Sequence, residues 1–500
     1  MDSLELLEAI RFGNRVAEHE RKDLVNYFVE TYQWRRLLRG EVDIIYGAKG
    51  SGKSAIYLLM DTVREMFEEE DRTIILPAEN YTGTPAFQVL DAQSLRKEGE
   101  TFLNDDLEAK LRFIWKLYFA SLIAEDLKSR GIRNDDIDQV IQYVEEAQLI
   151  PKEKSLKNML RSVVGFFRKN HLKDASLEVP GFSAKISFLE PDAEQLMKGV
   201  KTPQDLLESL EKGLEAMDWT VWVTLDRLDV AFASSEDRAL ERSALRSLFR
   251  VYLDFAGLER IRLKIFLRSD IWKKLMSTSF REASHITRHT TLKWDRTNLL
   301  SLIIKRLVSN EVVVEVLGNG ESKKNILADP VQQEALFYRI FPAKVDRQKT
   351  LNWVFSRIED GNGVVTPREL IHLLEEAKVQ QLLMEETGHG NGKKRSLISQ
   401  QALKAAFEEV SKARFRYTLL AETDILQNRI VEFKEGKAEH CLDSLLEIWT
   451  DMDAEDIIGT AEELVEIGFF HKRKSGEQIR YWIPHLYRPA LELVQGTDCK

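Results

Sequence analysis

The sequence predicts an α/β fold: a P-loop nucleotide-binding core with a parallel sheet, a large helical insertion, a helical lid and a C-terminal winged-helix module. Three observations predict it. An apolar segment at 42–47 runs into a glycine-rich turn, and a helical segment at 54–70 follows. Further short apolar segments alternate with helical ones, the pattern of a parallel sheet with crossover helices. The last hundred residues join a helix to a hairpin pattern.

Short apolar segments bounded by turn residues predict the strands of the core. A helical segment separates the first two within about 40 residues, which is the spacing of a βαβ unit. We therefore expect a five-stranded sheet from the segments 42–47, 72–77, 220–225, 262–269 and 286–294.

Helical spacing of apolar residues dominates the rest of the chain. The first forty residues are predicted to be helical, notably 23–38, and so is 106–127 within the insertion. A small hairpin is expected near 176–189, and helices are expected at 236–256 and 296–307.

The domain boundaries follow from these changes of pattern. Thr366 is the expected N-cap of a lid helix, with Pro367 at its first position and Glu369 closing a capping box. The glycine-rich polar stretch 385–396 is the best linker candidate. The expected parts are 1–94 (first part of the core), 95–215 (helical insertion), 216–310 (second part of the core), 311–385 (lid), 386–396 (linker) and 397–500 (winged-helix-like module).

Composition excludes several classes of protein. The 500 residues are 43% hydrophobic and 31% charged, which is ordinary for a globular protein, and no apolar run is long enough to span a membrane. The N-terminus lacks the pattern of a signal peptide, so we expect a cytoplasmic protein. The two cysteines, Cys441 and Cys499, are too few and too scattered for a disulfide framework or a zinc site. The net charge of −10 makes nonspecific binding to nucleic acid unfavourable.

The segment GAKGSGKS, 47–54, fits the G-x-x-x-x-G-K-[ST] phosphate loop (Walker A) at every fixed position. Glycines let backbone N–H groups surround phosphates, and the N-terminus of the following helix favours an anion. Lys53 is expected to reach the β and γ phosphates, and the Ser54 hydroxyl to hold Mg²⁺. The predicted nucleotide-binding residues of this loop are Gly47, Gly50, Ser51, Gly52, Lys53, Ser54 and Ala55.

Asp226, at the end of the strand 220–225, is the expected second ligand of Mg²⁺. An acid that activates water usually follows this aspartate directly, but Arg227 stands there and cannot accept a proton. Asp229 and Glu79 are the candidate replacements, each with an ordinary surface carboxylate as the alternative. We therefore expect slow hydrolysis of ATP.

These residues resemble the AAA+ and STAND branch of P-loop ATPases, including KAP-type and origin-recognition-type members, and within it a bacterial family of stand-alone ATPases. The segments that carry the resemblance are 12–31, 47–54, 225–229, 265–272, 366–371 and 481–491.

The resemblance implies further site residues. Phe12 and Gly13 match the segment that lines an adenine pocket. Arg268 matches a sensor of the γ-phosphate, and Arg368 matches the lid arginine, each with a structural salt bridge as the alternative. The remaining two candidates, for an arginine finger offered to a neighbouring subunit, are Arg281 and Arg288.

The C-terminal module has the pattern of a winged helix. One helical stripe holds Ala454, Ile457, Ile458, Ala461, Leu464 and Val465, Gly468 ends the helix, and 471–483 is the expected hairpin wing. Acidic residues crowd this helix, so DNA would repel it, whereas the wing carries the cations Lys472, Arg473, Lys474 and Arg480. We expect a protein-interaction module and keep contact with nucleic acid as the alternative.

Three functions remain open at this point. The first is an ATP-driven switch that self-associates as a homo-oligomer and engages a partner protein, with anti-phage defence as a setting that the resemblance implies. The second is an ATPase of the origin-recognition type that binds or loads DNA. The third is a nucleotide-binding scaffold that does not hydrolyse ATP, in which Arg227 marks an inactive site.

Overall fold

The structure, a computed structural model, describes residues 3–78, 104–151, 156–171, 185–186, 200–228, 238–277, 280–388, 396–421, 423, 426–476 and 478–499. By their internal contacts the residues form two units. The sheet unit comprises Tyr32–Gly47 and Lys53–Thr291. The helical unit comprises Met1–Thr31, Ala48–Gly52 and Leu292–Lys500, so it includes the tip of the phosphate loop.

A five-stranded parallel sheet forms the centre of the sheet unit and confirms all five predicted strands. The strand that leads into the phosphate loop is an inner strand of the sheet, and its two neighbours are the fourth and fifth strands along the chain. In spatial order the strands are β2 (Thr73–Pro77), β5 (Thr220–Leu225), β6 (Ile261–Arg268), β1 (Ile44–Gly47) and β7 (His289–Thr291).

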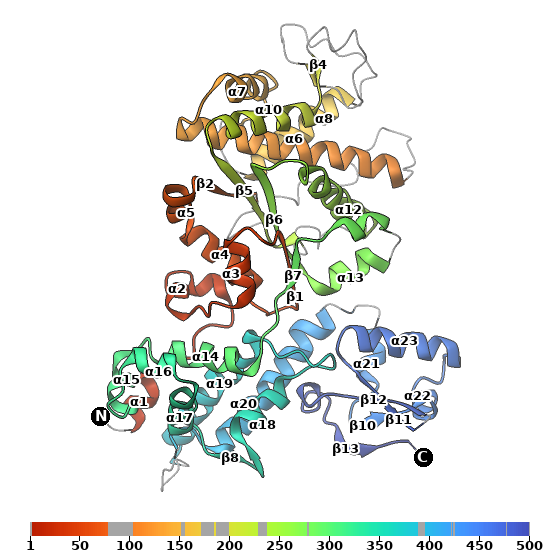
Figure 1. The fold of residues 1–500 in the computed structure, drawn as a ribbon. Coiled ribbons are helices and arrows are strands. Elements are labelled where there is room, and N and C mark those ends of the chain that lie inside the picture. Colours follow the sequence, from red (N-terminus) through yellow and green to blue (C-terminus); the bar gives the residue numbers. More distant parts are fainter. Residues whose placement is uncertain are drawn as a thin grey trace. The chain divides into compact units, whose positions relative to one another are not determined.

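Helices cover both faces of this sheet, which explains why its inner strands are almost continuously apolar. Figure 1 shows α4 (Lys53–Thr62) and α5 (Arg64–Asp71) on one side and α12 (Arg238–Phe255) and α13 (Ser269–Ser277) on the other. All four residues of β1 are buried.

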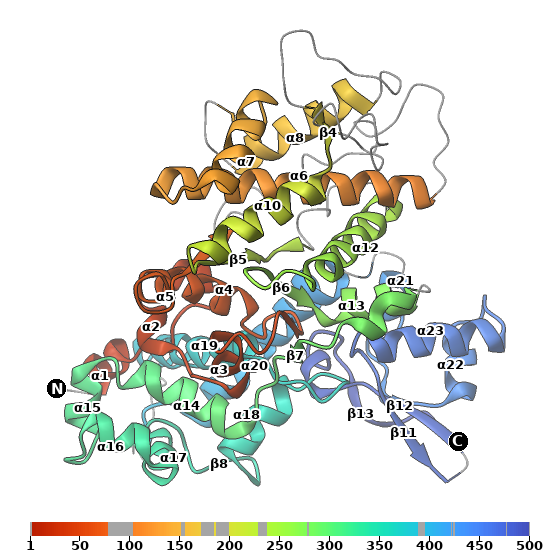
Figure 2. The same ribbon diagram turned by 45° about the horizontal axis from the view of Figure 1, so that its top comes forward.

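The helical insertion packs into the same apolar core as the sheet. Its longest helix brings Trp115, Tyr118 and Phe119 into that core, each fully buried. Figures 1 and 2 show the first and last of its helices running side by side. The described helices are α6 (Asn104–Arg130), α7 (Asp135–Glu146), α8 (Leu156–His171) and α10 (Pro203–Ala216).

Most of the hairpin predicted at 176–189 lies outside the described residues. The described part, β3 (Lys185–Ile186), pairs in parallel with β4 (Val200–Lys201) and therefore not as one arm of a hairpin.

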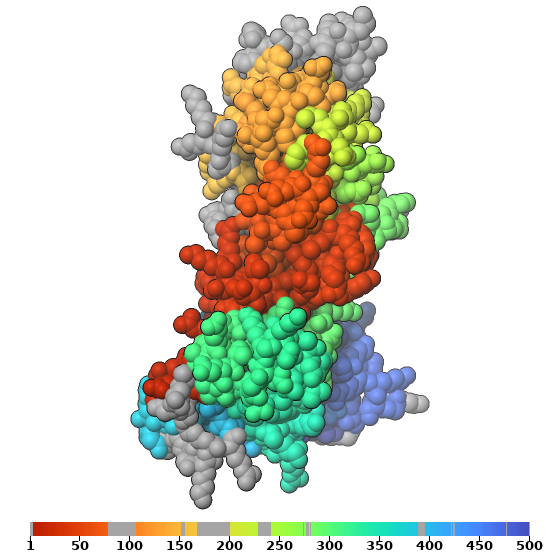
Figure 3. All heavy atoms as spheres, turned by 60° about the vertical axis from the view of Figure 1, so that its left-hand side comes forward, coloured from red at the N-terminus to blue at the C-terminus, as the bar shows by residue number. Residues whose placement is uncertain are grey.

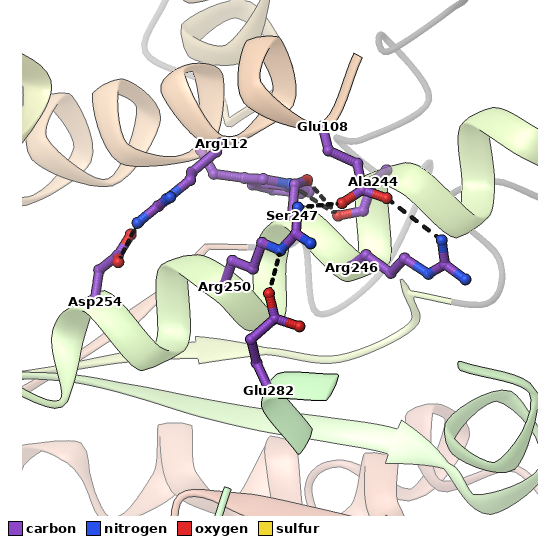
Figure 4. A network of polar contacts seen from close by, with 9 residues as sticks. Glu108, Arg112, Ala244, Arg246, Ser247, Arg250, Asp254 and Glu282 are labelled. Atoms are coloured by element: carbon purple, nitrogen blue, oxygen red, sulfur yellow. Dashed lines mark hydrogen bonds and ion pairs between the residues drawn. The ribbon is translucent and has the colours of Figure 1, made fainter. Parts of the chain in front are cut away.

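A polar network fastens the insertion to α12 (Figure 4). Glu108 on α6, whose side chain is 4% exposed, accepts hydrogen bonds from Arg246 and Arg250 of α12. Arg112, one turn further along α6, binds both carboxylate oxygens of Asp254. The insertion is thus joined to the helix that follows the Asp226 strand by charged contacts as well as by apolar packing.

The helix predicted at 23–38 was wrong as a continuous element. α2 (Leu24–Tyr27) ends at Phe28, whose backbone is extended with ψ 134°, and α3 (Tyr32–Leu38) begins four residues later. The Lys305 ammonium donates to the Phe28 carbonyl at 2.7 Å, and Val29 is buried against Leu302. These long-range contacts compete successfully with the local helical pattern. The other N-terminal helices are α1 (Ser3–Ala9) and η1 (Ala17–Glu20).

A second apolar core holds the helical unit together and draws in the N-terminal helix. Leu7, Ile10 and Phe12 are buried in it, and Figure 3 shows the N-terminal residues (red) among those of the later helices (green to cyan). A two-residue hairpin, β8 (Lys344–Val345) with β9 (Gln348–Lys349), interrupts the helices. These helices are α14 (Arg296–Leu307), α15 (Glu311–Leu317), α16 (Lys323–Ala328), α17 (Pro330–Ile340), α18 (Thr350–Ile358), α19 (Pro367–Glu386) and α20 (Gln400–Arg414).

The lid helix α19 begins where the sequence predicts, with Thr366 as N-cap and Pro367 at its first position. The capping box, however, is not formed. The Thr366 hydroxyl donates to the Glu369 carboxylate, whose other oxygen pairs with Arg414 at 2.9 Å. Glu369 therefore serves the packing of α20 against α19 rather than the helix terminus.

A third apolar core begins at Phe415 and contains the C-terminal module. α20, which precedes it, packs in the second core with the lid, so the packing changes later than the predicted boundary at 397. The module contains the π-helical turn η5 (Phe415–Leu420), the helices α21 (Gln427–Val431), α22 (Leu442–Ile448) and α23 (Ala454–Glu466), and the turn η6 (His485–Tyr487).

The predicted wing is confirmed as an antiparallel hairpin of β11 (His471–Ser475) and β12 (Gln478–Trp482). It belongs to a four-stranded sheet with β10 (Lys437–His440) and β13 (Val494–Thr497). The apolar stripe of α23 is narrower than predicted, because Ile458 is 45% exposed and Ala454 is also exposed.

The two cysteines are not scattered in space. β10 pairs with β13 through Glu439 and Thr497, and each cysteine follows two residues later. The Cys499 thiol contacts that of Cys441, and burial together with this contact raises the pKa of Cys499 to about 11. Their separation in sequence gave no sign of this contact, in which both cysteines are free thiols.

Candidate functional site

Two glycines shape the phosphate loop between β1 and α4. Gly50 and Gly52 have φ of +82° and +95°, the left-handed region that other residues reach only with strain. The Ser51 N–H donates to the Ala48 carbonyl at 3.1 Å and closes a turn between them. Gly52 stands at a fixed position of the motif and Gly50 at a variable one, and both have backbone conformations that glycine adopts readily.

Lys53 is the first residue of α4, and its ammonium donates to the Gly47 carbonyl at 2.9 Å. The side chain is 9% exposed, so the charge is held close to the loop backbone. Ser54 and Ala55 follow in the first turn of the helix, where backbone N–H groups have no partner inside the helix. An anion would be favoured at these N–H groups.

The carboxyl ends of the neighbouring strands carry the other candidate residues of the sheet unit. Asp226 directly follows β5 and is 3% exposed, Arg268 ends β6, and Gly47 ends β1 in register with Arg268. Parallel strands bring their carboxyl ends to one edge of the sheet, the edge where α/β proteins bind ligands. Arg268 binds both carboxylate oxygens of Asp270, at 3.0 and 2.8 Å.

Arg227 has a φ of +60°, which is rare for a residue with a side chain. The chain therefore turns sharply straight after Asp226. Asp229 and Glu79, the two candidates for a water-activating acid, lie outside the described residues.

The lid helix lies against the tip of the phosphate loop within the helical unit. The Arg368 N–H points to the Gly50 carbonyl at 3.4 Å, and a Cβ on Gly50 would lie 2.8 Å from that of Arg368. Within the described part of the chain, the half-buried Arg368 guanidinium makes no ion pair. Its charge is thus available close to the loop.

Trp294, which follows β7, is a contact of the loop that sequence reasoning missed. Its indole Nε1 donates to the Ser51 carbonyl at 2.7 Å, and its ring packs against the cluster of Val29, Leu302 and Ile371. Trp294 is the last residue of a predicted strand segment, so nothing in the local pattern sets it apart from a core tryptophan.

Phe12 and Gly13 form part of the second core. The Phe12 ring is 1% exposed and lies 5.8 Å from that of Phe341. Gly13 has a φ of +94°, and a Cβ there would meet the Arg306 guanidinium at 1.8 Å. Arg306 pairs with Glu20 at 2.8 Å in a buried ion pair, so this segment is held rigidly.

One face of α19 contacts both the N-terminal segment and the loop tip. His372 lies 3.3 Å from an Arg15 nitrogen, and Glu375 accepts the Phe12 N–H at 3.0 Å. Together with Arg368 these residues follow the helical spacing of one face. Burial and the charge of Arg15 lower the pKa of His372 to about 4, so His372 is neutral at physiological pH.

The two arginine-finger candidates differ in what the structure describes. Arg288 donates to Asp43 at 2.6 Å and to the Gly40 carbonyl, so its guanidinium has partners in its own chain. Arg281 begins the short helix η4 (Arg281–His285), and its side chain lies outside the described part. The finger role of either residue stays a prediction.

The residues present fit a nucleotide with Mg²⁺. The buried hydroxyls of Ser51 and Thr224 have no hydrogen-bond partner among the described residues, one in the loop and one on β5 before Asp226. Within the same residues no cluster of three or more His, Cys, Asp or Glu side chains forms a metal site. Mg²⁺ does not need one, since it takes one or two protein ligands and completes its shell with water and phosphate oxygens.

The cations of the wing have different surroundings. Lys472 pairs with Glu462 of α23 at 2.6 Å, and Arg480 pairs with Glu439 at 3.2 Å. Arg473 and Lys474 are exposed and make no ion pair with the described residues. The acidic helix thus neutralises part of the wing. No helix in the described ranges has the length and hydropathy needed to cross a membrane.

No protein-family model matches the chain. A curated relative, the putative transposon gamma-delta 80.3 kDa protein of Escherichia coli (strain K12), is 23% identical over 303 residues. This match covers 59% of the chain and 39% of the relative, so the chain spans about two fifths of the relative's length.

Three solved structures of similar length resemble the chain weakly. The Aeropyrum pernix ORC2 protein in its ADPNP–ADP complexes is 13% identical with a TM-score of 0.35, covering 96% of this chain and 94% of that one. The A. pernix ORC1 protein in complex with DNA is 12% identical with a TM-score of 0.34, covering 93% and 92%. For CDC6P of Pyrobaculum aerophilum the identity is 11% and the TM-score 0.28, covering 93% of both chains. The strand order and the loop, rather than these similarities, define the P-loop core.

Proposed function

We propose that the chain binds ATP with Mg²⁺ at its phosphate loop and acts as a nucleotide-driven switch that self-associates and engages a partner protein. One observation carries this proposal. The loop tip, with two glycines in left-handed conformations, lies against the lid arginine Arg368, whose charge no described residue neutralises.

Each side chain has a proposed part in holding the nucleotide. The loop N–H groups and the N-terminus of α4 bind phosphate oxygens, and Lys53 exchanges its contact with Gly47 for the β and γ phosphates. Ser54 and Asp226 would hold Mg²⁺, and the positive charge of the ion would neutralise part of the phosphate charge. Arg268 and Arg368 add positive charge from the sheet edge and the lid.

Hydrolysis is proposed to be slow because Arg227 occupies the position after the metal aspartate. Asp229 and Glu79 remain the candidates for orienting water. A slow reaction suits a switch, since the ATP-bound state then persists long enough to recruit a partner.

The proposed biological setting is bacterial and connected with mobile genetic elements. The name of the E. coli relative refers to a transposon, which supports a role connected with mobile genetic elements. Anti-phage defence in bacteria is one such role, and we propose it on the resemblance of the loop, sensor and lid segments. The partner would bind the insertion or the C-terminal module.

Calorimetric titration with ATP and Mg²⁺ tests the nucleotide site. We expect the Lys53→Ala variant to bind ATP at least about 20-fold more weakly than wild type, because a charge-assisted contact to phosphate is lost. Lys49→Ala is the matched control: it removes the same charge from a variable position of the same loop and should leave the affinity within about threefold. Absence of heat with the wild-type chain, or equal losses in the two variants, contradicts the proposal.

The alternative is a DNA-binding or DNA-loading ATPase, which the exposed cations Arg473 and Lys474 on the wing favour. The acidic residues of α23 oppose it. A gel shift at increasing salt separates the two functions. Binding of duplex DNA that weakens steeply with salt, and is lost when Lys472, Arg473 and Lys474 are changed to alanine, would favour the alternative.

The further alternative is a scaffold that binds ATP without hydrolysing it. Measuring the release of phosphate from ATP distinguishes this scaffold from an ATPase. We expect the wild-type chain to release more phosphate than Lys53→Ala, and Asp229→Asn to release less than wild type. Equal release from wild type and Lys53→Ala would leave only the scaffold.

A further inference from the structure

We infer that Arg473 and Arg488, which stack on Trp482, form a binding site for a phosphate group in the helical unit together with Arg357, which stacks on Trp353. The site is independent of the phosphate loop and of the proposed ATP binding. We call these three residues the arginine cluster.

Two members of the arginine cluster are fixed on one indole ring. The guanidinium carbons of Arg473 and Arg488 lie 4.5 and 4.6 Å from the centroid of the Trp482 ring. Arg473 comes from β11, Trp482 from β12, and Arg488 directly follows η6. Arg488 is 9% exposed and its Nε donates to the Ile483 carbonyl at 3.0 Å, so its position is set by the core.

The third member comes from the lid. Arg357 lies near the end of α18, with its guanidinium carbon 5.3 Å from the Trp353 ring centroid. α18 contacts η6, the turn that directly precedes Arg488, so Arg357 lies on an element packed against the C-terminal module. Cations from the second and third apolar cores therefore meet at this point.

The cluster is not neutralised. Among the described residues, none of the three guanidiniums makes an ion pair, whereas Arg480 and Lys472 of the same hairpin both do. Burial, with Arg357 and Arg473 as positive neighbours, lowers the pKa of Arg488 to about 10. Burial and the two arginines Arg357 and Arg488 likewise lower the pKa of His485 to about 3, so His485 stays neutral.

The mutual repulsion of the three arginines needs an explanation, because the chain as a whole has a net charge of −10 and thus many carboxylates that could pair with them. A buried or half-buried arginine is normally paired, because a charge without a counter-ion is costly away from water. Here the charge of Asp346 acts on Arg357, but Asp346 forms its ion pair with Lys404. The cluster therefore has no ion-pair partner among the described residues, and an external anion is the missing partner. Stacking on Trp482 and Trp353 keeps the guanidinium groups in place for it.

The chemistry of guanidinium selects the ligand. Its planar fork binds phosphate oxygens through paired N–H donors, and several arginines together favour an anion of more than one charge. A phosphate group of a polyphosphate or of a nucleic-acid backbone meets this requirement. Because Arg357 belongs to the lid and Arg473 to the wing, the bound phosphate would also fasten the C-terminal module to the lid helices.

The test uses the full chain with Lys53→Ala, so that the lysine of the phosphate loop does not contribute. Tripolyphosphate is titrated by calorimetry and a labelled short duplex DNA by fluorescence anisotropy. We expect the further changes Arg357→Gln and Arg473→Gln together to weaken binding of the phosphate ligand at least about tenfold. The matched control for the tripolyphosphate titration is Lys474→Gln, which removes a neighbouring exposed charge from the same strand and should change the affinity for tripolyphosphate less than about twofold.

Thermal unfolding gives a second readout that does not depend on an affinity. Tripolyphosphate should raise the Tm of the parent chain more than a chloride salt of equal ionic strength, and should lose this effect in the double variant. The single variant Arg473→Gln should also show a smaller rise in Tm with tripolyphosphate than the parent chain. Because Arg473 is exposed, this variant should fold normally even if the double variant does not.

The two probes separate the sources of the phosphate. If duplex DNA displaces tripolyphosphate, the site takes a nucleic-acid backbone; if only tripolyphosphate binds, the site takes a small phosphate compound. If neither probe binds, the inference is overturned. It is also overturned if Lys474→Gln loses as much affinity for tripolyphosphate as the double variant does. A failure of ATP to bind the wild-type chain would overturn the proposed function and leave this result unaffected.

Discussion

Individual side chains hold the tip of the phosphate loop in place. The Ser51 carbonyl accepts the indole N–H of Trp294, and Gly50 lies against Arg368. A loop that binds phosphates through its backbone needs its N–H groups pre-oriented, because ordering them on binding would reduce the affinity. Trp294 therefore has the properties of a positioning residue.

The Trp294→Phe variant tests this role. It keeps an aromatic ring and removes the N–H donor, so we expect the Kd for ATP to rise about fivefold to tenfold, as for the loss of one hydrogen bond. Trp353→Phe is the control, because the buried Trp353 indole N–H has no hydrogen-bond partner among the described residues. If both variants bind ATP like the wild type in calorimetry, Trp294 only fills the core.

A buried lysine makes stability depend on pH. Lys264 on β6 is fully buried and donates to the Val42 carbonyl at 2.9 Å and to Asp43 at 2.7 Å. Burial lowers the pKa of Lys264 from 10.5 to about 8, although Asp43 opposes the shift. Between pH 8 and pH 10.5 the Lys264 amine binds its proton more tightly in the unfolded chain than in the folded chain. The free energy of unfolding therefore increases as the pH rises through this range.

Urea unfolding of wild type and Lys264→Met at several pH values checks this sign. The cost of the buried charge is fully present below about pH 8 and fades toward pH 10.5. We expect the stability of wild type relative to the variant to increase over this range, by on the order of 3 kcal/mol. A difference that is constant or falls with pH contradicts the lowered pKa.

Among the elements of the fold, the helices α7 and α10 of the insertion pack closely because one of them carries a glycine at the contact. Gly213 in α10 faces the start of α7, where a Cβ would lie 2.5 Å from Ile137 Cγ1. The Gly213 carbonyl also accepts the side-chain N–H of Asn134, the N-cap of α7, at 2.8 Å. A glycine inside a helix usually costs stability, but here it permits the contact.

The Gly213→Ala substitution should therefore destabilise the chain, by about 1–3 kcal/mol, because the methyl group overpacks the contact. Gly165→Ala in α8 is the matched control: no atom lies within 4 Å of its Cβ position, so alanine should stabilise the helix by about 0.5–1 kcal/mol. Thermal or urea unfolding of both variants measures the signs. Stabilisation by both would show that the α7–α10 contact can relax.

Nucleotide-dependent assembly belongs to the scale of the whole molecule. The lid helix contacts the N-terminal segment and the loop tip through one face, so ATP would act on elements from distant parts of the sequence together. This link, and the proposed arginine fingers, predict that ATP with Mg²⁺ changes the state of association.

Sedimentation velocity with and without ATP and Mg²⁺ measures that change. We expect wild type to sediment faster with ATP, and Lys53→Ala to be unaffected because it cannot hold the phosphates. Arg281→Ala should bind ATP normally but release less phosphate than wild type if it supplies the finger. A sedimentation coefficient that ATP leaves unchanged would contradict self-association and leave ATP binding standing.

The sequence by itself determined the features that depend on neighbouring residues. All five strands were predictable. Four of them (β1, β2, β5 and β6) are short and mostly apolar runs, as expected of strands buried on both faces. The fifth, β7, is a polar and largely exposed strand within the predicted segment 286–294. The phosphate loop was predictable because Gly47, Gly52, Lys53 and Ser54 stand close together in sequence at the fixed positions of the motif. The start of α19 at Thr366 and the wing hairpin were predictable from capping and turn residues.

Only the tertiary structure decided the features that join distant residues. The break in the helix at Phe28 depends on the hydrogen bond from Lys305. The indole of Trp294 reaches the phosphate loop only in the folded chain, and the pairing of β10 with β13 brings Cys441 close to Cys499. The arginine cluster likewise combines a lid helix with a wing. Local patterns carry no information about these contacts, because chain folding brings together side chains whose separation in sequence ranges from tens to hundreds of residues.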